Sequence, residues 1–161
     1  MFGKIKHTNF PPNYKPQLVW DGECGFCKYW ITYWKSNTGN TIDYKTYQEI
    51  ASNYKDVPLK EFKKASRLIE TDGNIYSGPD SAFRSFTYFS PPNHFWHTLY
   101  SKNHLFTWLV DHSYNFIAKH RPFMFKLTHL FFGRDPINLK WYWLGYIALL
   151  IIVITAIIFV L

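Results

Sequence analysis

A Cys-x-x-Cys pair stands where one short strand ends and a helix begins, and this placement narrows the folds open to the chain. Residues 17–20 form a short apolar run that stops at Asp21-Gly22, a turn dipeptide. After the turn, apolar side chains recur at the spacing of one helical face, at Cys27, Trp30, Ile31 and Trp34. The two cysteines, Cys24 and Cys27, therefore occupy the first turn of a helix that follows a buried strand.

The chain beyond this helix predicts further strands and helices in alternation. A second strand is expected at residues 41–47 and a helix at residues 59–65. Residues 67–78 predict a hairpin, because Asp72-Gly73 supplies the positive φ of a tight turn. An aromatic helix follows at residues 79–89, and the pattern stays helical to about residue 130. This order predicts an α/β domain with a mixed sheet flanked by helices.

The cysteine pair is a candidate redox site. At a helix start, unpaired amides and the helix dipole stabilise a thiolate, which lowers the thiol pKa of Cys24. Cys27 lies one turn further along the same face, as a disulfide between the two would require. We expect Cys24 to be the exposed attacking sulfur and Cys27 the more buried resolving sulfur. The alternative is a pair of small core residues without chemistry, since cysteine is often fully buried.

Three segments carry a family resemblance: WDGECGFC at residues 20–27, TDGNIYSGPDSA at 71–82 and YNFIAKHR at 114–121. Together they resemble the DCC family of predicted thiol-disulfide oxidoreductases, the DUF393 group, over residues 17 to about 125. The resemblance implies a thioredoxin-like fold and dithiol chemistry at Cys24 and Cys27, and we expect no metal or organic cofactor. It also implies kinship with larger membrane proteins in which such a domain accompanies many spans.

Two departures from ordinary thioredoxins accompany this resemblance. Phe26 stands where a proline usually lies between the cysteines, and no proline immediately precedes Arg67. The redox potential is therefore not carried over, and we expect no cis-proline substrate shelf. Asp21 belongs to the motif and is a third candidate site residue. It either sets the turn into the helix or relays protons to the thiols, and its Asp-Gly context favours the turn.

The C-terminal end predicts a membrane span. Residues 141–161 contain no charge and would cover roughly 30 Å as a helix, about the thickness of the hydrocarbon layer. Aromatic residues cluster at its start, as in an interfacial belt. We accordingly divide the chain into an irregular arm (1–16), a thioredoxin-like DCC domain (17–130), a basic juxtamembrane linker (131–140) and a transmembrane helix (141–161).

The charges beside this run predict the side on which the domain lies. The segment before the span contains one acidic residue, Asp135, and several basic residues: Lys119, Arg121, Lys126, Arg134 and Lys140. This excess favours the cytoplasmic side. Residues 1–16 contain no apolar stretch of the kind a signal peptide needs. We therefore expect a single-pass membrane protein whose N-terminal domain is cytoplasmic. The run stops without a polar residue, which fits either a tail anchor or the front of a longer multi-span protein.

The predicted function is thiol–disulfide exchange by a membrane-anchored domain. Its partners would be a protein or small-molecule disulfide, membrane lipid and other membrane-protein subunits. One alternative is a non-catalytic accessory or assembly subunit with a structural Cys-x-x-Cys. A less favoured alternative is a zinc site that combines the cysteines with His94 and His97, whose spacing is shorter than usual. The net charge of +7 is scattered rather than clustered, so nucleic-acid binding is not expected.

Overall fold

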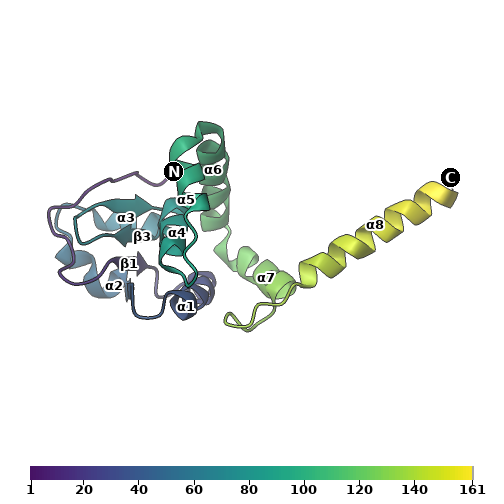
Figure 1. The fold of residues 1–161 in the computed structure, drawn as a ribbon, viewed down its shortest axis with the longest axis horizontal. Coiled ribbons are helices and arrows are strands. Elements are labelled where there is room, and N and C mark those ends of the chain that lie inside the picture. Colours follow the sequence, from purple (N-terminus) through teal and green to yellow (C-terminus); the bar gives the residue numbers. More distant parts are fainter. Residues whose placement is uncertain (161) are drawn as a thin grey trace.

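The computed structural model describes residues 1–160, and its centre is a four-stranded mixed sheet (Figure 1). Strands β1 (Gln17–Trp20), β2 (Asp43–Thr46), β3 (Arg67–Ile69) and β4 (Ile75–Ser77) lie in the order β2-β1-β3-β4. β1 pairs in parallel with β2 and antiparallel with β3, and β3 pairs antiparallel with β4. The predicted α/β class with a mixed sheet flanked by helices is confirmed.

The helices follow the predicted order with some changes in length. Their bounds are α1 Gly25–Thr38, α2 Tyr47–Ile50, α3 Leu59–Lys64, α4 Pro79–Ser85, α5 Phe95–Lys102, α6 His104–Lys119, α7 Arg121–Phe132 and α8 Tyr142–Val160. Single 3₁₀ turns follow α2 at Ala51–Asn53 and α4 at Phe86–Tyr88. α1 continues past Trp34, the last residue of the apolar stripe, and ends at Thr38 with Gly39 as its C-cap. The helix expected at residues 79–89 ends at Ser85 and continues only as a 3₁₀ turn.

Both faces of the sheet are covered. Leu18 and Val19 are consecutive in β1 and fully buried, so their side chains enter opposite faces. Val19 packs with the cluster beneath α2 and α3, formed by Tyr54, Val57, Phe62, Ile69 and Ile75. Leu18 packs with Ile31 of α1 and with Ile42 and Leu68. The sheet is thus the middle layer of a three-layer domain (Figure 1), and it holds the end of β1 beside the start of α1.

The hairpin turn between β3 and β4 requires glycine at position 73. Gly73 has φ +87°, and a Cβ there would lie 2.6 Å from the carbonyl oxygen of Thr8. The positive φ predicted from Asp72-Gly73 is therefore confirmed. The close approach of Thr8 shows in addition that the N-terminal segment packs against this turn, because the amide of Thr8 donates to the carbonyl of Gly73 at 2.9 Å.

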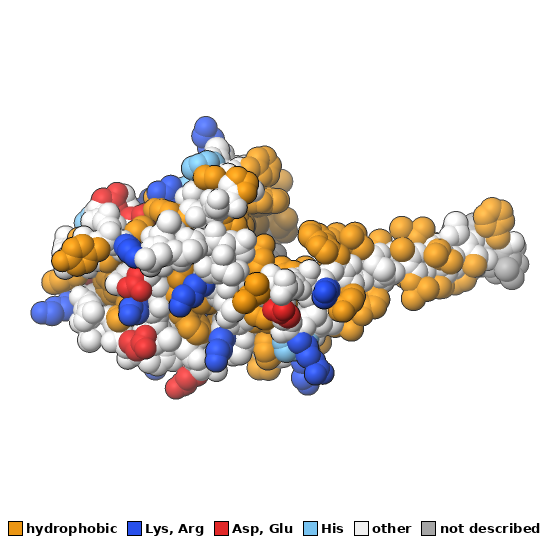
Figure 2. Space-filling model, turned by 60° about the horizontal axis from the view of Figure 1, so that its bottom comes forward, with side chains coloured by type: hydrophobic (Ala, Val, Ile, Leu, Met, Phe, Trp, Pro, Cys, Tyr) orange, Lys and Arg blue, Asp and Glu red, His pale blue; other side chains and the backbone are white. Residues whose placement is uncertain are grey.

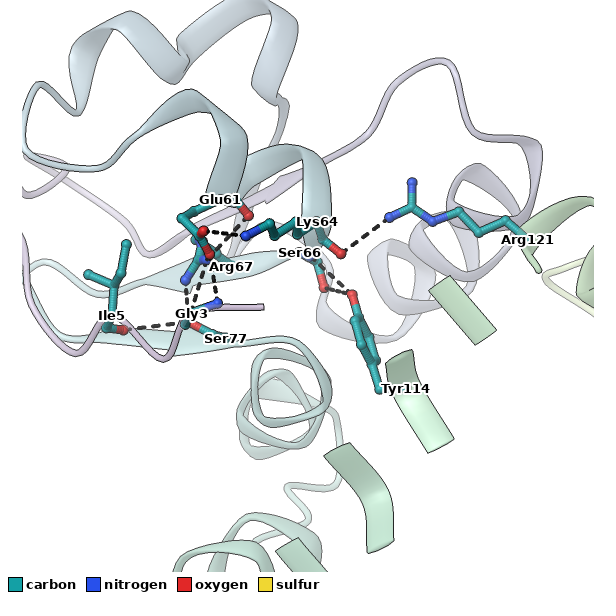
Figure 3. A network of polar contacts seen from close by, with 9 residues as sticks. All are labelled: Gly3, Ile5, Glu61, Lys64, Ser66, Arg67, Ser77, Tyr114 and Arg121. Atoms are coloured by element: carbon teal, nitrogen blue, oxygen red, sulfur yellow. Dashed lines mark hydrogen bonds and ion pairs between the residues drawn. The ribbon is translucent and has the colours of Figure 1, made fainter. Parts of the chain in front are cut away.

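The N-terminal arm is mostly irregular, yet it is tied to the domain. The amide of Ile75 donates to the carbonyl of Lys6 at 2.9 Å, so the arm lies along the edge of β4. Further in, a buried ion pair joins Arg67 to Glu61 at 3.2 Å. Gly3 donates its amide to the same Glu61 carboxylate and accepts from Arg67 through its carbonyl (Figure 3). The arm therefore closes one edge of the sheet.

The C-terminal helix α8 leads away from the domain (Figure 1). Hydrophobic side chains follow one another along it, and charged side chains gather only at its domain end (Figure 2). Across residues 1–160, no helix combines the length and hydropathy that crossing a membrane demands. The predicted transmembrane helix is therefore not supported. The observed helix has 19 residues and begins after Trp141, and Leu161, the last residue of the predicted span, lies outside the described residues.

Candidate redox site

Cys24 is the N-cap of α1. Its backbone is extended, and its Sγ accepts a hydrogen bond of 3.1 Å from the amide of Cys27. The amide of Cys24 in turn donates to the carbonyl of Asp21 at 3.2 Å, which closes the turn after β1. A side chain at this position satisfies one of the unpaired amides of the first helical turn. The sequence placed both cysteines at the helix start, and the structure does the same.

The surroundings of the two sulfurs separate their acidities. Hydrogen bonding by the side chain and the amide of Cys27, together with the positive charge of Arg121, lowers the pKa of Cys24 to about 6, although burial and Asp21 oppose this. The pKa of Cys27 is raised, because it donates to the Cys24 thiolate, is partly buried and feels the thiolate's charge. At neutral pH Cys24 is therefore mainly thiolate while Cys27 keeps its proton.

Both cysteines are free thiols, and both are half-buried. The expectation that Cys24 would be exposed is thus too simple, since its sulfur is partly covered. α7 packs closely on the start of α1. A Cβ on Gly25, the residue after Cys24, would come within 3.2 Å of the Phe125 ring. Glycine at this position therefore allows α7 to lie directly beside the dithiol.

Asp21 is held by three donors. Its Oδ1 accepts from the amide of Glu23 at 3.2 Å and from Nε2 of Gln48 at 3.0 Å. Its Oδ2 accepts from Nη1 of Arg121 at 2.9 Å. Gln48 also accepts from the amide of Gly22 at 3.2 Å, so it binds the turn at two points. These contacts hold the turn into α1, which is the first of the two roles predicted for Asp21.

Arg121 was quoted within a family segment and counted among the basic residues, but no role at the site was predicted for it. It is the first residue of α7 and lies 100 positions from Asp21 in the sequence. Its Nη2 also reaches the carbonyls of Lys63 and Lys64 at 3.4 and 3.5 Å, as Figure 3 shows for Lys64. One guanidinium thus joins α7, the end of α3 and the cysteine turn.

Ser66 occupies the position immediately before β3, and the sequence therefore has no proline at this point. Its amide donates to the hydroxyl oxygen of Tyr114 at 3.1 Å (Figure 3). Its hydroxyl lies 2.8 Å from that of Ser81. Burial raises the pKa of Tyr114, so this phenol remains neutral. Tyr114 and Arg121 belong to the same family segment, and the structure brings both to the edge of the site.

A cavity of about 390 Å³ adjoins Cys27, and no sequence pattern predicted it. The polar and charged residues in its wall are Asp21, Ser66, Ser113, Tyr114, Arg121 and Thr128. The aromatic and aliphatic part of the wall is built by side chains of several elements: Trp20, Phe26, Trp30, Ile31, Trp34, Phe62, Ala65, Pro79, Ala82, Phe83, Val110, Ile117, Ala118, Met124, Leu127, Phe131 and Phe132.

The histidines considered for a zinc site lie elsewhere. Nδ1 of His97 is 2.8 Å from the carboxylate of Asp80, and its ring packs edge-on against Tyr76. Within residues 1–160, no three His, Cys, Asp or Glu side chains are grouped so that they could hold a metal ion. The cysteines and His97 therefore do not assemble into the zinc site considered as an alternative.

Comparison with known proteins supplies a family. The model of the family described as DCC1-like thiol-disulfide oxidoreductase matches residues 18–127, which is more than half of the chain. No curated protein matches the chain, and no solved structure does. The matched range includes the cysteine pair, the hairpin and the segment that carries Tyr114 and Arg121. The chain belongs to the DCC1-like thiol-disulfide oxidoreductase family.

Proposed function

We propose that the domain catalyses thiol–disulfide exchange on a thioredoxin-like framework. The observation that carries this proposal is the thiolate-stabilising position of Cys24, whose pKa is about 6 at the start of α1. The Cys24 thiolate attacks one sulfur of a substrate disulfide, and the other sulfur leaves as a thiolate. Cys27 then loses its proton to this leaving thiolate and attacks Cys24. The second substrate sulfur leaves as a thiolate and takes a proton from water. The products are a Cys24–Cys27 disulfide and two substrate thiols.

The same geometry supports an order for the two steps. Two of the causes that raise the pKa of Cys27 are its hydrogen bond to the Cys24 thiolate and the charge of that thiolate. Both disappear when Cys24 enters a mixed disulfide. The pKa of Cys27 then falls, so the resolving thiolate forms only after the first attack. In this proposal Asp21 positions the turn and pairs with Arg121.

Single cysteine substitutions test this assignment. Cys27→Ser should accumulate mixed disulfides with added substrate, because the resolving sulfur is missing. Cys24→Ser should abolish turnover, because the attacking thiolate is missing and no Cys24–Cys27 disulfide can form. Mixed disulfides are read by non-reducing electrophoresis and intact mass, and turnover by the release of substrate thiol. Near-full turnover in both variants would remove the enzymatic proposal.

A second candidate is an accessory subunit in which the cysteine pair is structural. The half-burial of both thiols favours it. Rapid alkylation separates the candidates, because a structural pair should resist iodoacetamide until the domain unfolds. The enzymatic candidate requires one thiol to react in the folded protein, with a pH midpoint near 6.

We also propose that α8 attaches the domain to a membrane. The support is the charge-free run at residues 141–161 and the exposure of its apolar side chains, such as Leu149 at 60% and Ile152 at 64%. Membrane lipid, and other subunits embedded in it, would be the partners. Deletion of residues 141–161 should release a domain with an intact thiol pair. If the full chain leaves membranes in carbonate, the attachment proposal is wrong.

The proposed side is cytoplasmic, on the basis of the basic residues that precede α8. A membrane-impermeant maleimide applied to intact cells should leave Cys24 unlabelled and should label it after lysis. Labelling from outside would reverse the orientation. In the cytoplasmic arrangement the pair rests mainly as a dithiol, and its disulfide forms only during turnover.

A further inference from the structure

The cavity beside Cys27 has a polar end and an apolar body. Cys27, Asp21 and Arg121 lie at the polar end, next to the start of α1. The body extends between α1, α4, α6 and α7, where aromatic and aliphatic side chains form nearly all of the wall. Cys27 lines the cavity, and the Sγ of Cys24 accepts a hydrogen bond from the Cys27 amide at 3.1 Å. An apolar space beside this pair is not needed for a disulfide carried on a polar group.

The size of the cavity indicates the kind of occupant. One turn of a partner helix, 5.4 Å long and about 10 Å wide, fills about 400 Å³, so the cavity of about 390 Å³ would hold a single turn at most. Pockets for small ligands range from about 300 to 1,000 Å³ and are mostly apolar with few polar groups. The cavity therefore suits a small molecule better than a segment of another protein.

We propose that the cavity binds the apolar group of a small-molecule disulfide, and that this class of molecule is the substrate of the Cys24/Cys27 pair. This inference rests on the proposed function. The apolar group lies between α4, α6 and α7, and the disulfide lies at the polar end. The Cys24 thiolate attacks the disulfide, one substrate thiolate leaves, and Cys27 resolves the mixed disulfide as described above, so that the substrate is reduced to two thiols.

A series of alkyl 2-pyridyl disulfides tests this inference on the full chain. The alkyl group is lengthened from ethyl to octyl, and the second-order rate constant is measured from the release of 2-thiopyridone. Burial of each methylene should raise this constant about fourfold until the cavity is full. A chain-length dependence that begins with ethyl and reaches a plateau is the expected result.

Two alanines in the cavity wall provide the variants. Ala82 lies on α4 and Ala118 on α6, so leucine at either position fills part of the cavity from a different side. Both Ala82→Leu and Ala118→Leu should lower the ratio of the octyl to the ethyl rate constant at least tenfold, which is less than the loss of two buried methylenes. Ala148→Leu, on an exposed position of α8, is the matched control and should keep the ratio.

The outcomes separate this inference from the proposed function. If the ethyl probe modifies neither cysteine of the folded protein, the proposed function fails. If the ethyl probe reacts and chain length has no effect, only the cavity inference is overturned. It is also overturned if both Ala82→Leu and Ala118→Leu keep the octyl preference, because the chain would then bind elsewhere, for example along α8. Circular dichroism of each variant confirms that a lowered ratio comes from a folded domain. If one variant does not fold, the other still tests the inference.

Discussion

Replacing Arg121 with glutamine removes the positive charge that joins α7 to the cysteine turn. Arg121 lowers the pKa of Cys24, and its guanidinium lies 2.9 Å from the Asp21 carboxylate. In Arg121→Gln the thiolate of Cys24 loses a favourable charge, while the unfavourable charge of Asp21 is no longer neutralised. Both changes act in the same direction, so the pKa of Cys24 should rise.

The size of this rise follows from the geometry. A nearby opposite charge shifts a pKa by roughly 1 to 3 units. Arg121 is partly exposed, and its charge lowers the pKa of Cys24 less than the hydrogen bonds of Cys27 do. We therefore expect its loss to raise this pKa by about 1 unit. At pH 6 the thiolate fraction then falls from about one half to about one tenth. Each thiolate becomes about threefold more nucleophilic, because nucleophilicity rises with thiol pKa.

The two effects oppose each other at low pH and not at high pH. The rate constant with an ethyl 2-pyridyl disulfide should therefore fall about twofold at pH 6 and rise about threefold at pH 8. Asp21→Asn should shift the midpoint of the pH profile the other way, since the Asp21 charge raises the pKa of Cys24. Arg134→Gln, an exposed cation on the chain after α7, is the matched control and should leave the profile in place.

The pH profile of the rate constant between pH 4 and pH 9 is the measurement. An unchanged midpoint in Arg121→Gln would refute the electrostatic role of Arg121. A midpoint that rises in Asp21→Asn would refute the opposing role of Asp21.

Two further substitutions test how the fold holds the site. Gly22→Ala should lower the free energy of unfolding by about 1 to 3 kcal/mol, because the new Cβ would lie 2.7 Å from the methyl group of Thr46. Gly145→Ala is the control and should not destabilise the chain, because Gly145 has open space around it. Glu61→Gln should cost roughly 3 kcal/mol at pH 7 because it breaks a buried ion pair. The pKa of Glu61 is lowered in the fold, chiefly by Lys64, so this stabilisation is present above the unfolded pKa and disappears as the pH falls below about 4. Urea unfolding at pH 7 and pH 3 measures the free energy of unfolding of both variants. An equal loss in Glu61→Gln at the two pH values would contradict the prediction for Glu61.

The local part of the site could be predicted because its signals lie close together in the sequence. An apolar run, a turn dipeptide and a helical stripe within about twenty residues place Cys24 at a helix start. The same is true of the hairpin at Gly73, whose positive φ follows from its turn chemistry. Each of these signals depends on backbone preferences that operate over a few residues.

The rest of the site depends on packing that no local pattern records. Gln48 and Arg121 reach Asp21 from 27 and 100 residues away, and the cavity exists because α7 packs on α1. Arg67 illustrates the same limit in the core. A charged arginine usually lies in solvent, yet Arg67 is fully buried. Its Nη1 and Nη2 donate to Ser77, to Glu61 and to the carbonyl of Gly3, whereas its Nε has no partner among the described residues.

The separated acidities of the two sulfurs also bear on the direction of electron flow. With a pKa of about 6 in place of an ordinary value near 8.5, Cys24 stabilises the reduced protein at pH 7 by about one pKa unit, or roughly 1.4 kcal/mol. Cys27 is protonated at pH 7 whether its pKa is raised or ordinary, so it adds nothing to the stability of the reduced protein. For a two-electron couple this raises the reduction potential by about 30 mV. If Arg121 accounts for about one unit of the shift, its replacement removes about 20 mV of that increase, since the gain at pH 7 falls to about 0.3 units. Equilibration of both proteins with defined glutathione ratios measures this difference. Equal potentials would show that the charge of Arg121 does not act on the Cys24 thiolate.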